Sequence, residues 1–156
     1  HVMEVDGADV CLIDGGVVAN NPTACAIAEA ARWNDSHDAG LSLRDFIVAS
    51  FGTGHVTRPI TAEQAREWGA LEWAVPAIDV LMDGAGDATE YIARHLLADD
   101  HYFRFQAPLT SAFDDLDDAS ETNLNALVNL AKHHLEHEGG DAKLDQLVSV
   151  LCDERH

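Results

Sequence analysis

Basic residues are scarce in this 156-residue chain, which has nine lysines and arginines against 28 aspartates and glutamates and a formal net charge of −19. Nucleic-acid binding is therefore not expected, because contacts with phosphates depend on lysine and arginine. Simple electrostatic docking on anionic lipid is also excluded, since it relies on basic clusters. A protein with this charge can meet a lipid only through apolar surface.

Cysteine and long apolar runs are scarce as well. The three cysteines, Cys11, Cys25 and Cys152, form no C-x-x-C pair, so we expect a reducing compartment and no disulfide scaffold. Cys11 falls in a predicted strand and Cys25 in a predicted helix, and both are predicted to be small buried residues. No apolar run approaches the length of a membrane span. Apolar residues make up 47% of the chain, which is enough for the core of one domain.

The stretch over residues 10–22 has the most informative pattern in the chain. The apolar run Val10 to Ile13 predicts a buried strand, because it is short and is followed by Asp14 and two glycines. An acid at the C-terminal end of a buried strand lies where open α/β sheets usually have their active sites. The spacing leaves two interpretations of Asp14 open, a catalytic acid and a residue that only caps a turn.

The residues that follow Asp14 predict a turn and then a helix. Gly15 and Gly16 have no Cβ, so the backbone can turn sharply there or approach another group closely. Pro22 is predicted to be the first residue of a helix over residues 22–33, with Asn21 as its N-cap. The whole unit is therefore a strand, an acidic turn and a helix.

Apolar spacing and capping residues predict the remaining elements. Strands are expected over residues 43–51 and over residues 101–106, the second with one exposed face. The segment Gly52-Thr53-Gly54 between them is interpreted as a tight turn near the rim of the active site, not as a nucleotide-binding loop. Helices are expected from Thr61, over 68–82 as a core helix kinked by Pro76, over 86–97, over 121–137 after the N-cap Ser120, and over 144–151.

Two clusters have features of metal sites, and other interpretations fit them better. His133 and His137 have the i, i+4 spacing of zinc ligands, but the H-E-x-x-H base is missing, so a solvated helix face is expected. The aspartates within residues 114–118 lack the EF-hand spacing, so a loop that caps the next helix is expected. His55, after the glycine turn, is interpreted as a rim residue. No metal and no cofactor are predicted.

The sequence LIDGGVVANNP resembles the second catalytic block of the patatin-like phospholipases, in which a D-G-G or D-G-A motif holds the aspartate of a serine–aspartate dyad. Later blocks are similar, in the same order, to the C-terminal half of bacterial members: Ser50–Gly54, Trp68-Gly69 through Asp83-Gly84, Tyr102–Phe105 and Asp117–Ser120. The resemblance covers most of the chain. It implies a three-layer α/β fold of the patatin-like, lysophospholipase-like type, with residues 1–156 as the C-terminal part of a single domain.

This resemblance also implies a chemistry. The family places its nucleophile in a G-x-S-x-G elbow, and none of the serines here has that pattern: Ser36, Ser42, Ser50, Ser111, Ser120 and Ser149. The expected activity is carboxylic ester hydrolysis of the phospholipase A or lysophospholipase type, with the serine outside this chain. Asp14 would accept the serine proton and return it to the leaving alcohol, and an apolar acyl pocket would raise the pKa of Asp14. This chain alone is expected to be inactive.

The same resemblance gives the other site residues and the partners. Gly15 and Gly16 would let Asp14 reach the elbow, and Asn20 and Asn21 would orient the loop or, more simply, cap the helix. The expected partners are a phospholipid or another acyl-ester lipid, and the missing N-terminal half or a second copy of the chain. A cytoplasmic protein with peripheral membrane association is expected, and the 68–82 helix could contact acyl chains as a lid. The rivals are a non-catalytic patatin-like binding or regulatory module and an unrelated α/β domain with Asp14 as a metal ligand.

Overall fold

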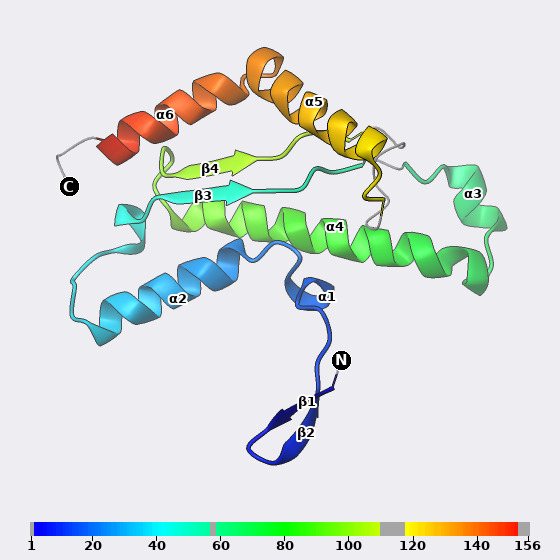
Figure 1. Ribbon diagram of the computed structural model, residues 1–156, viewed down its shortest axis with the longest axis horizontal. Helices are drawn as coiled ribbons and strands as arrows, with labels where there is room; N and C mark the ends of the chain where they lie inside the picture. The colour runs from blue at the N-terminus through cyan, green and yellow to red at the C-terminus, as the bar shows by residue number, and fades with distance from the viewer. Residues whose placement is uncertain (1, 57–58, 110–117, 153–156) are drawn as a thin grey trace.

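The computed structural model describes residues 2–56, 59–109 and 118–152. It combines helices and strands (Figure 1), which is consistent with the α/β class predicted from the sequence. The elements follow in the order β1 (Val2–Val5), β2 (Ala8–Cys11), α1 (Gly16–Ala19), α2 (Thr23–Ser36), the 3-10 turn η1 (Leu43–Asp45), β3 (Val48–Phe51), α3 (Ala62–Glu67), α4 (Ala70–Leu96), β4 (Tyr102–Phe105), α5 (Glu121–His137) and α6 (Gly140–Cys152).

Strands β3 and β4 form a parallel pair at the centre of the molecule. Their register runs from Val48 opposite Tyr102 to Phe51 opposite Phe105. Parallel neighbours require a long crossover, which α3 and α4 supply here. The carboxyl ends of both strands therefore meet at one edge of the sheet, next to Gly52 and Gln106.

Hydrophobic clusters lie on both faces of this strand pair. On one face, Tyr102 of β4 packs with Ile27 of α2, with Ala93 of α4 and with Leu97, the residue that follows α4. On the other face, Phe103 and Phe105 of β4 pack with Leu147 of α6. All three aromatic residues of β4 are buried, so the prediction of a half-exposed strand is wrong. The reason is that helices cover β4 from both sides, which the alternation of its sequence does not reveal.

Strands β1 and β2 form a separate antiparallel hairpin that extends away from the other elements (Figure 1). Its turn has positive φ at Asp6 (52°) and Gly7 (79°), the conformation that favours Asp-Gly in a tight hairpin. All residues of both strands are exposed, so the buried strand predicted over residues 10–13 is wrong. In the described part of the chain the two strands pair only with each other, and no third strand extends this sheet.

Helix α4 is one continuous helix of 27 residues, where the sequence predicted a kinked helix over 68–82 and a second helix from 86. A glycine in a helix interior costs only about 1 kcal/mol, so Gly84 and Gly86 weaken the helix without ending it. The core position predicted for its first half is also wrong, because Leu71 is 88% exposed and Leu81 is 72% exposed. Among the described elements, none covers this apolar face.

Other helix termini match the sequence prediction. Thr61 Oγ1 accepts the Gln64 amide at 3.2 Å and the Gln64 side chain accepts the Thr61 amide at 2.9 Å, so the capping box of α3 is confirmed. Ser120 is the N-cap of α5, and its hydroxyl accepts the Asn123 amide at 3.2 Å. The strand predicted over 43–51 is shorter than expected, because η1 occupies its first residues and only β3 is extended.

The exposure of the cysteines differs from the prediction. Cys11, Cys25 and Cys152 are free and all three are exposed, so the expected burial of the first two is wrong. Their neighbours on the hairpin and on the outer face of α2 do not enclose them. No helix in the described part of the chain has both the length and the apolar character to span a bilayer.

Candidate functional site

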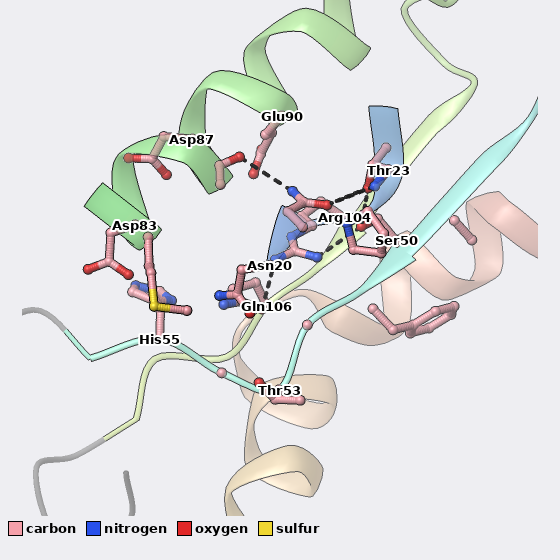
Figure 2. A pocket seen from close by; sticks show the side chains of 18 of the residues that line it. Asn20, Thr23, Ser50, Thr53, His55, Asp83, Asp87, Glu90, Arg104 and Gln106 are labelled. Carbon is pink, nitrogen blue, oxygen red and sulfur yellow. Dashed lines mark hydrogen bonds between the residues drawn. The ribbon is translucent and has the colours of Figure 1, made fainter. Parts of the chain in front are cut away.

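A cavity of about 920 Å³ lies along β3 and extends past the carboxyl end of that strand. Figure 2 shows that its walls come from the segment between α1 and α2, from β3 and the glycine turn after it, and from one face of α4. Arg104 of β4, Gln106 after that strand and Lys143 of α6 also line the cavity. This is the edge of a parallel sheet at which α/β proteins bind ligands.

A directed chain of hydrogen bonds crosses the floor of the cavity. Arg104 Nη1 donates to Ser50 Oγ at 2.9 Å, and Thr23 Oγ1 donates to Asn21 Oδ1 at 2.6 Å. The Ser50 and Thr23 hydroxyl oxygens are 2.9 Å apart. Because the Thr23 proton is used on an oxygen that can only accept, Ser50 must donate to Thr23. All three bonds therefore point from Arg104 toward Asn21.

This direction gives Ser50 a structural role. Its proton is donated to a threonine hydroxyl, and its oxygen accepts from a guanidinium group. A nucleophilic serine needs a base as the acceptor of its proton, and neither neighbour is one. That the nucleophile is not Ser50 stays a prediction.

Asn21 joins the two helices that border the cavity. Its Oδ1 accepts the Thr23 amide at 3.2 Å, and its Nδ2 donates to the Gly86 carbonyl of α4 at 3.4 Å. Pro22, and not Asn21, occupies the N-cap position of α2, which starts one residue later than predicted. Asn21 precedes the N-cap residue Pro22, and its side chain still accepts the amide of Thr23, the first residue of α2. Asn20 lines the cavity beside it and is exposed.

Asp14 forms a tight turn of its own outside this cavity. Its Oδ1 accepts the Gly16 amide at 2.7 Å, and a Cβ on Gly16 would lie 3.1 Å from that oxygen. A side chain at Gly16 would therefore be in tight contact with the Asp14 carboxylate, and the role of Gly16 in letting Asp14 reach the serine stays a prediction. Gly15 has an ordinary φ of −61° and open space around it, so the turn does not require a glycine there. Asp14, Gly15 and Gly16 are exposed or half-buried and are absent from the described residues that line the cavity.

The opposite wall of the cavity is acidic. Asp83, Asp87 and Glu90 are spaced at i, i+4 and i+7 and therefore share one face of α4, as Figure 2 shows. Glu90 is paired with Arg94 at 2.7 Å. The cavity thus has carboxylates on the α4 side and the Arg104 guanidinium on the β4 side, which suits a ligand or segment with hydrogen-bonding groups.

The glycine turn after β3 lines the cavity, and its predicted place at the rim of the active site stays a prediction. Gly54 has a φ of +103°, and a Cβ there would lie 2.5 Å from Leu109. His55 lines the cavity, and its backbone is fixed by bonds to the Ala107 carbonyl at 3.0 Å and the Leu109 amide at 2.7 Å. His55 is therefore held beside the cavity by its backbone.

The two clusters with features of metal sites have other roles. His133 and His137 are exposed with rings stacked at 4.7 Å, as expected for a solvated helix face. Asp114, Asp115 and Asp117 lie outside the described residues. Asp118 lies before α5, and its Oδ1 accepts the amide of the N-cap residue Ser120 at 3.0 Å. That bond, together with the Ser120 hydroxyl, lowers the pKa of Asp118. No group of three or more possible metal ligands occurs within the described ranges.

Sequence reasoning missed the polar floor of the cavity, formed by Thr23, Ser50, Arg104 and Gln106. A partial signal was present, since Ser50 interrupts an apolar strand and Arg104 alternates with aromatic residues in β4. The missing information was the pairing of β3 with β4, which brings residues 54 positions apart in the sequence into contact.

Comparison with known proteins gives relatives of one kind. The chain is 31% identical to patatin-like protein 6 of Arabidopsis thaliana over 92% of its own length and 31% of that protein. It is 31% identical to patatin-B1 of Solanum tuberosum, over 78% of the chain and 35% of that protein. It is 27% identical to probable inactive patatin-3-Kuras 1 of Solanum tuberosum, over 96% of the chain and 46% of that protein. No family model matches the chain.

The homologues of this chain are therefore patatin-like proteins. The similarity extends over most of the chain, while the chain spans only about a third to a half of the length of these relatives. The mixed helix and strand architecture is consistent with an α/β patatin-like domain.

Proposed function

We propose that residues 1–156 are the C-terminal part of a single patatin-like phospholipase domain of three layers, and that the whole protein is a lipid acyl hydrolase. The observation that carries the proposal is the similarity to patatin-like proteins over 92% of the chain. The Asp14 turn supports it, because the D-G-G sequence holds one carboxylate oxygen on the Gly16 amide at 2.7 Å. The resemblance to bacterial members at this motif belongs to the same proposal.

In the proposed reaction, a serine outside this chain attacks the ester carbonyl carbon while Asp14 takes the serine proton. The acyl group passes to the serine oxygen, and the alcohol leaves with the proton returned by Asp14. Water then releases the acid by the same route. Asp14 Oδ1 is engaged by Gly16, and Oδ2 has no hydrogen-bond partner among the described residues, so one oxygen is available for proton transfer.

The experiment compares the longer polypeptide that contains this chain with its Asp14→Asn variant on a short-chain p-nitrophenyl ester. Asparagine keeps an oxygen for the Gly16 amide and cannot act as a base, so we expect turnover to fall by about 10²- to 10⁴-fold. Asp9→Asn, on the exposed strand β2, is the matched control and should retain full turnover. An Asp14→Asn variant that is folded and fully active would show that the dyad assignment is wrong.

A non-catalytic binding or regulatory module is the second candidate. It is favoured by the similarity to a protein named probable inactive patatin, over 96% of the chain. Binding of the longer polypeptide to phosphatidylcholine vesicles without ester hydrolysis would support this module. Hydrolysis that depends on Asp14 would support the enzyme. The same vesicle experiment tests the proposed peripheral association of a cytoplasmic protein with membranes.

A further inference from the structure

The dipeptide Asp-Gly occurs in three different backbone environments of this chain. Asp6-Gly7 forms the turn of the β1–β2 hairpin, Asp14-Gly15 begins the tight turn before α1, and Asp83-Gly84 lies inside α4. An aspartate that precedes a glycine is open to attack by the backbone on its own side chain, because glycine has no Cβ to shield its amide nitrogen. The three pairs have the same chemistry, so the backbone around each pair decides which of them reacts.

The hairpin turn leaves the Gly7 amide available for reaction. Asp6 and Gly7 are both exposed, with φ of 52° and 79°. The Gly7 amide donates no hydrogen bond to any residue that the structure describes. A Cβ built on Gly7 would meet nothing within 4 Å, so the space around this residue is open. The Asp6 carboxyl group and the Gly7 nitrogen are therefore neighbours that nothing separates.

The strands next to this turn are easily opened. Glu4 and Asp9 lie directly opposite each other in the register, and like charges at such a pair are destabilising. Asp6 adds a third carboxylate at the turn itself. The two strands pair only with each other among the described residues, and a two-stranded hairpin is marginally stable in water. The turn can consequently rearrange until the Asp6 carboxyl carbon meets the Gly7 nitrogen.

We propose that Asp6-Gly7 is a site of spontaneous isoaspartate formation. The Gly7 nitrogen attacks Cγ of the protonated Asp6 carboxyl group, a C–N bond forms, and the hydroxyl group leaves as water with the amide proton. The product is a succinimide ring. Water then opens the ring. Attack at Cγ restores aspartate, whereas attack at the main-chain carbonyl leaves the chain connected through Cγ and turns that carbonyl into a free carboxylate. No oxidant, metal or partner takes part.

The modification changes the hairpin. An isoaspartate inserts an extra carbon atom into the main chain at the turn. A two-residue turn with positive φ at both positions fixes the register of its hairpin through its backbone geometry, so the lengthened turn cannot keep Val5 opposite Ala8. The hairpin lies directly before the Asp14 turn in the chain. The modification is independent of the proposed function, since it needs only this turn and water.

The other two Asp-Gly pairs are internal controls. Gly84 lies inside α4, where an interior amide donates to the carbonyl four residues earlier, so its nitrogen is not available until the helix opens. Asp14 Oδ1 is held by the Gly16 amide at 2.7 Å, which directs its carboxyl group away from the Gly15 nitrogen. We therefore expect isoaspartate to form fastest at Asp6, more slowly at Asp14 and at least about tenfold more slowly at Asp83.

Peptide mapping after prolonged incubation in mildly acidic buffer tests this order, in the chain and in the longer polypeptide that contains it. Electron-transfer fragmentation distinguishes isoaspartate from aspartate although their masses are equal, and the succinimide appears as the loss of one water. Isoaspartate that accumulates first at Asp6 supports the proposal. A rate at Asp6 no higher than the rate at Asp14 or at Asp83, in either protein, would overturn it.

Two variants of Asp6 give a second readout. Asp6→Asn keeps the turn, because Asn-Gly favours the same geometry, and its cyclisation releases ammonia in place of water, so that ring opening raises the mass. This variant should gain mass at least about tenfold faster than the matched control Asp83→Asn in α4. Asp6→Gly also keeps the turn and should form no isoaspartate there. Equal mass gain in the two asparagine variants would contradict the proposal.

Discussion

Removal of the single Thr23 hydroxyl should lower the free energy of unfolding by more than the loss of one hydrogen bond. Thr23→Val keeps the shape of the side chain and removes a hydroxyl that bonds to Asn21 at 2.6 Å and to Ser50 at 2.9 Å. Thr23 is 5% exposed and Ser50 is 9% exposed, so water replaces these bonds poorly. Each buried bond contributes about 1 kcal/mol, and the Ser50 donor is left without an acceptor, so we expect a loss of about 2–3 kcal/mol.

The direction of the hydrogen-bond chain predicts that Ser50→Ala costs less than Thr23→Val. In Ser50→Ala, the Thr23 hydroxyl keeps its bond to Asn21, and Arg104 keeps its bond to Gln106 at 3.1 Å. The double variant removes the stranded Ser50 hydroxyl as well. Its cost should therefore be smaller than the sum of the single costs by about 1 kcal/mol.

Urea unfolding followed by circular dichroism measures these free energies. Ser36→Ala is a suitable control, because Ser36 is exposed and its hydroxyl bonds only to groups of its own helix end; it should change the free energy of unfolding by less than about 0.5 kcal/mol. A Thr23→Val variant as stable as this control would refute the reasoning. Strict additivity in the double variant would refute the bond between the two hydroxyls. A larger cost for Ser50→Ala than for Thr23→Val would refute the direction assigned to the bonds.

Three further results are expected. Leu97→Ala should cost about 2–5 kcal/mol in urea unfolding, because Leu97 is 2% exposed in the cluster with Ile27 and Tyr102, and a cost below about 1 kcal/mol would place it outside the core. Gly140→Ala should cost about 1–3 kcal/mol of unfolding free energy, since the added Cβ would lie 2.7 Å from the Leu135 Cα. Gly84→Ala should stabilise α4 by about 0.5–1 kcal/mol, because nothing lies within 4 Å of the added Cβ. A lower melting temperature for Gly84→Ala than for Gly140→Ala would contradict the packing. The pKa of Asp118 is lowered by the Ser120 amide and hydroxyl. The support that Asp118 gives to the N-cap residue Ser120 should therefore be fully present above the ordinary aspartate pKa of about 3.9 and be lost only as the pH falls through the lowered value. An NMR titration with an ordinary or raised pKa would refute this.

Capping and turn chemistry could be predicted from the sequence because these features depend on neighbours within four residues. The Thr61–Gln64 capping box and the Ser120 cap both match the prediction. Helix α5 also has the predicted bounds, Glu121–His137. Each depends on a side chain that bonds to its own backbone, and this requires no knowledge of the rest of the fold.

Burial was predicted less well, since apolar spacing shows which face of an element avoids water but not what covers it. Strand β4 is enclosed by α2 and α4 on one face and by α6 on the other, while the run around Val10 and the face of α4 around Leu71 stay exposed. The continuity of α4 through Gly84 and Gly86 was missed for a related reason, because the cost of two glycines is small against the packing of a long helix.

The sequence by itself determined the local turn at Asp14, the caps of α3 and α5 and the similarity to patatin-like proteins, since all of these lie in short contiguous segments. Only the tertiary structure decided the composition of the cavity floor. Parallel pairing of β3 with β4 brings Arg104 onto Ser50, and the packing of α2 brings Thr23 to the same point. The physical reason is that these contacts join residues tens of positions apart, whose partners are fixed by strand order and not by local preference.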